Sequence, residues 1–511
     1  MRSSEGAFLK ACVLSALVGV LWSCAPVPNP QLGNVPAATP SLIDTTALRG
    51  YTRFLADDAL AGRMTGTPGA DLSALYIMSE CIGIGFSPIG KSFLQPVTLG
   101  QTRILANQTT LQLRQPNGSR VYHVQDDFIP DFGLDRFAGF AGPTVYLGTS
   151  EDVASGTLGA TRLAGAIVLL SGSVVGPAED TLRARGALGI VQLTGDEGQY
   201  RLYVRSRGLS RLQLADSSIA PSFREEMPSL VASPRLSRDL VAGVSLDHAP
   251  IRLADSLIAR IGLERTATVS QNVGCMLEGS DAKAKDTAIA FAAHYDHLGI
   301  GLPDARGDSI YNGFSDDAAG VAMLLAVGNA LQKRPPGRPH HSILLLFFTG
   351  EEEGLLGSDF YVAHPTWSLD RIRGLVDLDA GAPPARPWSW RIAGKEGNET
   401  LARLAQDVAA DRGWSATTSP ATPNTDYFPF VRSRVPAIFI IPGSAPYQGL
   451  SADSSQALRR RWDHYHEPAD EWAADFPFSG LGRYAEYAYF IGRALDEAGS
   501  DKRVMRSNSG P

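Results

Sequence analysis

Side chains that bind divalent metal ions stand at five places in the second half of this 511-residue sequence. Imidazole nitrogens and carboxylate oxygens are both ligands of zinc, and a carboxylate beside an imidazole can fix its tautomer. Taken singly, each segment is also explained as a polar turn, and Asp317 is expected to cap a helix. Taken together, they predict metal chemistry. The five segments are Ala293–His297, Asn312–Gly320, Phe348–Gly354, Val376–Gly381 and His464–Asp470.

Closely spaced carboxylates in two of these segments point to a cation. Glu351, Glu352 and Glu353 follow an apolar run, and three adjacent carboxylates repel one another unless a cation lies among them. Asp377 and Asp379 alternate on a largely apolar segment, where burying an unpaired charge is costly. The four cysteines are too few for a thiolate zinc site or a disulfide framework. His and carboxylate side chains must therefore hold any metal.

Apolar segments and helical segments alternate after residue 270. Strands are predicted at 288–293, 342–348, 374–378 and 437–441, and the clearest helix at 318–332. Fully apolar strands separated by helices indicate a mostly parallel sheet covered on both faces. Ligands of such sheets bind beyond the carboxyl ends of the strands. The candidate side chains that follow three of the predicted strands are therefore expected to meet at one edge of the sheet.

The order and text of these segments resemble the M28 family of di-zinc exopeptidases, whose members with a protease-associated (PA) insertion are usually aminopeptidases. The resemblance runs over residues 44–500 and includes the opening segment Leu60–Gly69. Its motifs are Ala-His-Tyr-Asp-His-Leu-Gly from residue 293, Tyr-Asn-Gly-x-x-Asp-Asp-Ala-x-Gly from 311, Gly-Glu-Glu-x-Gly-Leu-x-Gly-Ser from 350 and Tyr-His-x-Pro-x-Asp from 465. It implies an α/β fold with a mostly parallel mixed sheet flanked by helices.

The resemblance also implies a site for two zinc ions. His294 and Asp379 would hold one ion, and Glu352 and His466 would hold the other. Asp316 would bridge both. His and carboxylate ligands with an open coordination position are typical of catalytic zinc, so the residue types agree with the implied roles.

Three further residues receive roles through the same resemblance. Glu351 would be the general base, and Asp296 would orient the His294 side of the site. Tyr427 stands where the family commonly has His; its phenol is expected either to donate a hydrogen bond to the oxyanion or to pack in the core. The segment 442–461 is expected to be a long loop that shapes the substrate entrance.

A β-rich segment at 135–250 resembles the PA domain, with an unrelated α/β insertion as the alternative. Cys81 and Cys275 are expected either to pair in an oxidising compartment or to remain buried thiols. The predicted organisation is a signal peptide (1–23), a Pro-rich tether (24–43), an N-terminal part of the peptidase domain (44–134), the PA-like insert (135–250), the zinc peptidase domain (251–500) and a C-terminal tail (501–511).

The N-terminus has the pattern of an export signal. The uncharged run from Ala11 to Trp22 is shorter than the roughly 20 residues that span a bilayer, and it suits the apolar core of a signal peptide. Leu21–Cys24 resembles a bacterial lipobox, so Cys24 is expected to carry a lipid anchor. The expected location is the periplasmic face of the bacterial envelope, at the outer membrane, or the medium if the signal is an ordinary secretory one.

The formal charge of −7, without a Lys/Arg cluster, argues against nucleic-acid partners. The expected partners are peptides, the only expected membrane contact is the anchor at Cys24, and no oligomeric state is predicted. The predicted enzyme is a metallo-aminopeptidase. A glutaminyl cyclase-like zinc transferase and a carboxypeptidase of the same fold are the alternatives. The sequence lacks the Gly-x-Ser-x-Gly and His-Glu-x-x-His motifs of common serine hydrolases and single-zinc proteases.

Overall fold

The computed structural model describes residues 42–498, except 131–138, 157, 160, 175, 220–226, 244, 246–248, 334–336 and 380. The predicted signal peptide, Cys24, nearly all of the predicted tether and the predicted tail 501–511 lie outside the described residues. Within the described part of the chain, no helix combines the length and apolar character needed to cross a membrane.

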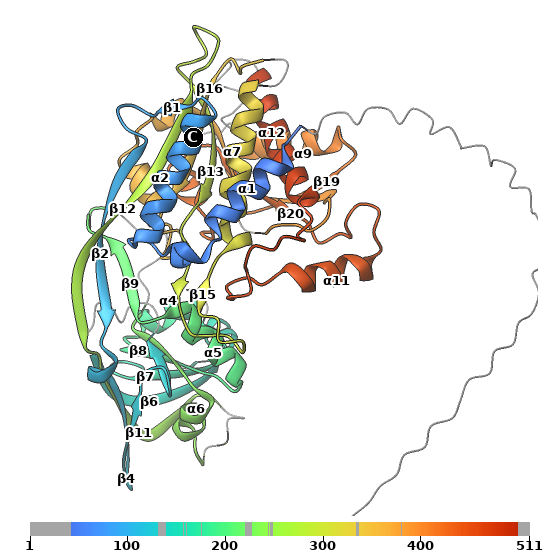
Figure 1. Cartoon of the computed structure of the whole chain (residues 1–511). Coiled ribbons are helices and arrows are strands. Elements are labelled where there is room, and N and C mark those ends of the chain that lie inside the picture. Colours follow the sequence, from blue (N-terminus) through green and yellow to red (C-terminus); the bar gives the residue numbers. More distant parts are fainter. Residues whose placement is uncertain are drawn as a thin grey trace, which may run out of the picture. The chain divides into compact units, whose positions relative to one another are not determined.

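A mixed ten-stranded sheet forms the larger half of the described chain (Figure 1). Its strands, in spatial order, are β19 (Ser415–Ser419), β18 (Ser389–Ala393), β20 (Ala437–Pro442), β17 (Ile372–Asp377), β13 (Ala288–His294), β16 (Ser342–Phe348), β12 (Leu263–Leu277), β2 (Leu94–Ile104) and β9 (Ser210–Leu214), with β1 (Ser87–Pro88) paired to β12. The central strands β16, β13, β17 and β20 are mutually parallel. The four predicted strands are confirmed, with ends that differ by at most two residues.

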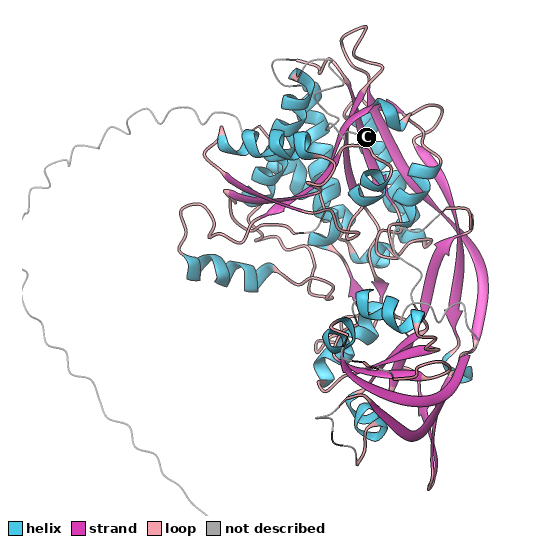
Figure 2. Ribbon diagram, turned by 180° about the vertical axis from the view of Figure 1, so that it is seen from behind, coloured by secondary structure: helices cyan, strands magenta, loops and turns pink. Residues whose placement is uncertain are grey.

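Helices cover both faces of this sheet, as Figure 2 shows. In β13, Ile289, Phe291 and Ala293 enter one core, while Ala290 and Ala292 enter the other. The first core is completed by α1 (Thr45–Leu55), α2 (Pro68–Gly83), α7 (Ala319–Lys333), α9 (Glu399–Ala410) and α12 (Ser479–Glu497), and the second by α8 (Leu356–Ala363) and α10 (Tyr427–Arg432). Because side chains alternate across a strand, an apolar run without polar breaks is what a sheet covered on both faces requires.

A second sheet of eight strands includes most strands of the segment predicted as an insert and extends beyond both of its ends. Its strands begin at Thr110 and end at Arg260, outside both ends of the predicted range 135–250. In spatial order they are β4 (Gly118–His123), β3 (Thr110–Gln115), β11 (Ile251–Arg260), β6 (Gly139–Thr149), β7 (Ile167–Ser171), β8 (Gly189–Leu193), β10 (Ser229–Ala232) and β5 (Phe128–Pro130). The helices of this region are α3 (Ser150–Ala154), α4 (Gly176–Ala184), α5 (Glu197–Arg207) and α6 (Pro234–Leu240). Its likeness to a PA domain stays a prediction.

One strand from the segment that forms the second sheet belongs to the first sheet. Strand β9 lies in sequence between β8 and β10 of the second sheet, but it pairs with β2 at the edge of the first sheet. The backbone N–H of Leu212 in β9 also donates to the carboxylate of Glu353, 3.1 Å away, in the turn after β16. The segment predicted as an insert therefore contacts the acidic turn directly.

A disulfide joins Cys81 at the end of α2 to Cys275 in β12, across 194 residues of sequence. Closing so long a loop restricts the unfolded chain, so replacing both cysteines by Ala should lower the free energy of unfolding by about 2–5 kcal/mol. Urea unfolding of wild type and the double variant, each with and without reductant, measures this. Equal stability of all four samples would contradict a structural role for the bond.

Candidate metal centre

The five predicted metal ligands lie close together. Three of them stand at the carboxyl ends of parallel strands, and the other two lie in turns elsewhere in the chain. His294 is the last residue of β13, while Glu352 and Asp379 follow shortly after β16 and β17. Asp316 lies in the turn Phe314–Ala318 directly before α7, where its own backbone is not helical. His466 lies between α11 (Ala452–Trp462) and α12. The segment 442–461, predicted as a loop, thus contains most of a helix, which begins with Ser451 capping the Ser454 N–H.

The two carboxylate oxygens of Asp316 face two different imidazoles. Asp316 Oδ1 lies 3.1 Å from His294 Nε2, which is also 3.4 Å from Asp379 Oδ1. Asp316 Oδ2 lies 3.1 Å from His466 Nε2, which is also 3.2 Å from Glu352 Oε2. The donors form two groups within 4.8 Å, one with His294 and Asp379 and one with Glu352 and His466, and Asp316 belongs to both.

The buried atoms of this cluster fit a metal. The Nε2 atoms of His294 and His466 and Glu352 Oε1 have no hydrogen-bond partner among the described residues. Buried polar atoms without partners are costly, and these all point at other metal-binding atoms. Burial lowers the pKa of His294, yet Asp379 and Glu351 outweigh it and raise that pKa above its ordinary value. The pocket therefore attracts positive charge, and its nitrogen and oxygen donors are those that zinc accepts.

Residues 272–489, which include all of these donors, match peptidase family M28. This region is a peptidase family M28 domain. The chain is 26% identical to aminopeptidase Y of Saccharomyces cerevisiae over 258 residues, 49% of this chain and 45% of that protein. It is 27% identical to the probable leucine aminopeptidase 2 of Aspergillus oryzae over 151 residues, 28% of this chain and 27% of that protein. The chain thus spans less than half the length of these curated relatives.

Two solved structures share the fold over most of their length. An aminopeptidase from Aneurinibacillus sp. strain AM-1 superposes with a TM-score of 0.55 at 18% identity, over 89% of this chain and 93% of that one. The zinc aminopeptidase BSAP of Bacillus subtilis gives 0.52 at 16% identity, over 91% and 98%. At these identities the likeness concerns the fold, which is the predicted α/β zinc exopeptidase fold.

His297 is a site residue of the M28 domain to which the sequence analysis gave no role. Its Nδ1 lies 2.6 Å from Glu352 Oε1, but neither of its nitrogens makes a hydrogen bond of suitable geometry with a described residue. Its ring packs edge-on against His466. It belongs to the donor group that contains Asp316, Glu352 and His466. The signal available in the sequence was a second His three residues after His294.

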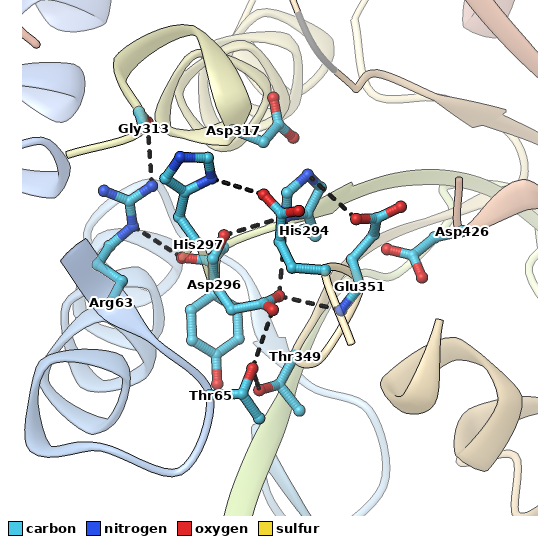
Figure 3. A network of polar contacts seen from close by, with 12 residues as sticks. Arg63, Thr65, His294, Asp296, His297, Gly313, Asp317, Thr349, Glu351 and Asp426 are labelled. Carbon is cyan, nitrogen blue, oxygen red and sulfur yellow. Dashed lines mark hydrogen bonds and ion pairs between the residues drawn. The ribbon is translucent and has the colours of Figure 1, made fainter. Parts of the chain in front are cut away.

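Asp296 makes hydrogen bonds with three neighbours, as Figure 3 shows. Its backbone carbonyl accepts a hydrogen bond from His294 Nδ1 at 3.1 Å, so Nε2 of the neutral ring is free of a proton and faces Asp316. Its carboxylate accepts hydrogen bonds from the Glu351 backbone N–H and the Thr65 hydroxyl. The expected carboxylate contact to His294 is longer, at 3.7 Å.

Glu351 lies beside the donor groups without belonging to either. Its Oε2 is 4.0 Å from His294 Nε2, and its side chain lines the adjacent cavity. Burial, opposed by His294 and reinforced by Asp379, raises the pKa of its carboxyl group. By contrast, burial and Asp316 raise the pKa of Glu352, but His466 and His297 outweigh them and lower it to about 2. Neighbouring carboxylates are thus given different proton affinities.

The turn that carries Asp316 is held by two other aspartates. Asp317 Oδ1 accepts the Gly320 N–H at 2.9 Å and so caps the start of α7, as predicted. A Cβ at Gly320 would lie 2.1 Å from Asp317 Oδ2 and 2.2 Å from the Leu378 carbonyl, so only glycine fits there. Asp470, also buried, accepts the backbone N–H groups of Ser315 and Asp316. This carboxylate sets the position of the residue shared by both donor groups.

Arg63 clamps the two loops that carry His294 and Asp316. It is fully buried, and its guanidinium donates to the carbonyls of Gly313 (3.0 Å; Figure 3) and Tyr295 (2.8 Å). It also donates to the carbonyls of Leu55 and Asn312. The preceding Gly62 has φ +69°, and a Cβ there would meet the Gly299 and Tyr311 carbonyls at 2.5 Å. These contacts explain why Gly and Arg follow one another in the opening segment Leu60–Gly69.

Replacing Arg63 by Met should lower zinc affinity by about 10- to 100-fold, because partners that orient ligands are typically worth that much. Arg63→Lys, which keeps the charge but loses the fork, should be intermediate. Arg53→Met is the control, since Arg53 makes an exposed ion pair with Asp57 and lies over the ring of Trp472, and neither partner is a predicted metal ligand. Competition titration with a chromophoric chelator measures the affinity; unchanged affinity in a folded Arg63→Met protein would contradict the clamp.

A cavity of about 560 Å³ opens beside the metal centre. Asp316, Glu351, Asp379 and Tyr465 are among the residues that line it. Tyr427 is not: it is fully buried, its hydroxyl accepts the Thr422 N–H at 2.8 Å, and it packs in the second core. Of the two expected roles for Tyr427, this placement matches packing, because its phenol is already engaged away from the cavity.

Proposed function

We propose that the M28 domain is a zinc-dependent exopeptidase that removes residues from the N-terminus of peptides. The observation that carries the proposal is the shared carboxylate. Asp316 presents one oxygen to each of two imidazole–carboxylate groups, at the wall of a cavity that also displays Glu351. This arrangement suits hydrolysis, which needs a polarised carbonyl and a residue that moves the proton of water.

Two zinc ions are the metal content that this arrangement supports. His294 and Asp379 would hold one ion, Glu352 and His466 the other, and Asp316 both. His297, in the second donor group, is a further candidate ligand. Bound at these positions, zinc supplies a Lewis acid for the scissile carbonyl and lowers the pKa of a coordinated water.

Glu351 is the residue that moves the proton. Because it lies outside both donor groups, its carboxylate stays available to accept a proton from the attacking water and to return it to the leaving amine. Acidic side chains in the cavity wall attract the ammonium group of a free N-terminus. Tyr465, stacked on His466 with ring centroids 3.8 Å apart, lines the same cavity, so it can reach a bound peptide.

Peptides blocked at the N-terminus or at the C-terminus test this proposal. Zinc-loaded protein should cleave a peptide with a free N-terminus and an amidated C-terminus, and it should not cleave the same peptide after N-acetylation. A third peptide has an acetylated N-terminus and a free C-terminus. If only this peptide were cleaved, the enzyme would be the carboxypeptidase instead. Loss of ammonia from an N-terminal Gln peptide, without hydrolysis, would indicate the cyclase. A chelator should abolish hydrolysis, and added zinc should restore it.

We propose in addition that the protein is exported and anchored by a lipid at Cys24, on the strength of the sequence pattern at 1–24 alone. Metabolic labelling with a radioactive fatty acid tests the anchor. Wild type should be labelled, and Cys24→Ala should not. Labelling of neither protein would leave an ordinary secretory signal as the reading of this segment.

A further inference from the structure

Two arginines share the cavity wall with the acidic residues of the metal centre. Arg391 comes from β18, and Arg459 comes from the last turn of α11. With Asp316, Glu351 and Asp379 facing the metal centre, the charged groups left on the wall are these two guanidiniums and one carboxylate, Asp463. No ion pair joins Asp463 to either arginine in the part of the chain that the structure describes.

Strand register places Arg391 level with the metal centre. Asp377 pairs with Phe439, and Arg391 pairs with Ile441, two residues further along β20. Extending this register by two residues puts Asp379 in the same row as Ile441 and Arg391. Adjacent strands lie about 4.8 Å apart, so Arg391 starts about 10 Å from the Asp379 backbone, across one intervening strand.

The side chain of Arg391 leaves the sheet on the cavity side without a partner. Trp390 and Ile392, its neighbours along β18, are buried in the first core, so Arg391 points to the opposite face, where it is exposed. Its guanidinium makes no hydrogen bond or ion pair with any described residue. A cation on the wall of a concave site with no counter-charge of its own is available to a ligand.

Arg459 is held at the cavity by the loop before α11. It donates to the Ala445 carbonyl at 2.7 Å and lies 4.5 Å from the ring centroid of Tyr447, which itself lines the cavity. These contacts fix the guanidinium without neutralising it. Guanidinium groups match carboxylates because their planar fork can donate two parallel hydrogen bonds.

We infer that the site takes short peptides that carry a carboxylate within one to three residues of the scissile bond, bound by Arg391 and Arg459. The inference rests on the proposed function and specifies its substrate class. A separation of about 10 Å corresponds to roughly three extended residues. The carboxylate has two possible sources: the side chain of an N-terminal Glu or Asp, or the C-terminus of a dipeptide or tripeptide.

Two pairs of substrates separate these sources. Glutamyl- and glutaminyl-p-nitroanilide differ only in the side-chain carboxylate, while Leu-Gly-Gly and its C-terminal amide differ only in the terminal one. In at least one pair, kcat/KM should be about 10- to 100-fold higher for the charged member, as expected for charge-assisted hydrogen bonds. Arg391→Gln should remove most of that ratio and leave kcat/KM for the neutral member within about twofold.

The matched control is Arg460→Gln, because Arg460 is the exposed neighbour of Arg459 and does not line the cavity. It should keep the wild-type ratio, while Arg459→Gln should lower it. Zinc content of each variant confirms that the centre is intact. Equal kcat/KM within both pairs, or equal losses on charged and neutral members in Arg391→Gln, would overturn the inference and leave the proposed function standing. Absence of hydrolysis of all four substrates would overturn both.

Discussion

Glu351→Gln is expected to lower kcat by about 10²- to 10⁴-fold while the zinc content stays unchanged. The amide has the shape of the carboxylate but cannot accept the proton of the attacking water. Glu351 lies outside both donor groups, so the metal should remain. Its backbone N–H, which binds Asp296, is untouched by the substitution. Steady-state kinetics and elemental analysis of the same preparation measure the two quantities.

The matched control for this variant is Glu353→Gln, two residues away in the same turn. Glu353 accepts the Leu212 N–H, and an amide oxygen can do the same. Burial, opposed by Arg211, raises the pKa of Glu353 to about 7, so a neutral side chain costs little there. Activity within about threefold of wild type is expected. Near-normal turnover of zinc-loaded Glu351→Gln would remove Glu351 as the proton acceptor.

Asp316→Ala is expected to abolish activity and to lower the zinc affinity of both sites by more than about 100-fold. Its two oxygens face His294 and His466 separately, so one substitution takes a donor from each group. Asp379→Ala removes a donor from the His294 group alone and should empty only that site. Zinc per protein after dialysis should therefore fall towards zero in the first variant and towards one in the second.

The outcome that contradicts a shared ligand is equally specific. If Asp316→Ala kept one zinc ion at wild-type affinity, the carboxylate would serve a single group. If both variants lost the same single ion, Asp316 and Asp379 would belong to one site. A wild-type protein that binds one ion only would contradict the two-ion proposal directly.

Local sequence was sufficient for the central sheet and for the meeting of the predicted ligands. The strands β13, β16, β17 and β20 are unbroken apolar runs, and such runs are stable as parallel strands covered on both faces. Because parallel strands end at one edge, the polar residues after them had to come together. His294, Glu352 and Asp379 follow from this rule, which needs only the order of residues along each segment.

Contacts between distant segments could not be read from that order. Arg63 reaches the Tyr295 carbonyl across 232 residues, and Cys81 meets Cys275 across 194. His297 enters a donor group because its loop turns back towards Glu352. Residue types alone do not show which of two chemically possible partners is in contact, because that depends on how the distant segments pack.

The sequence by itself determined which residue types could hold a metal, the strands that carry three of them, and the family whose motifs they share. Only the tertiary structure decided that Tyr427 packs in the core while Tyr465 lines the cavity, and that the second sheet begins at Thr110. The reason is one of range. Strand and helix preferences act over a few neighbouring residues, whereas the direction of a side chain and the pairing of β9 with β2 depend on everything packed around them.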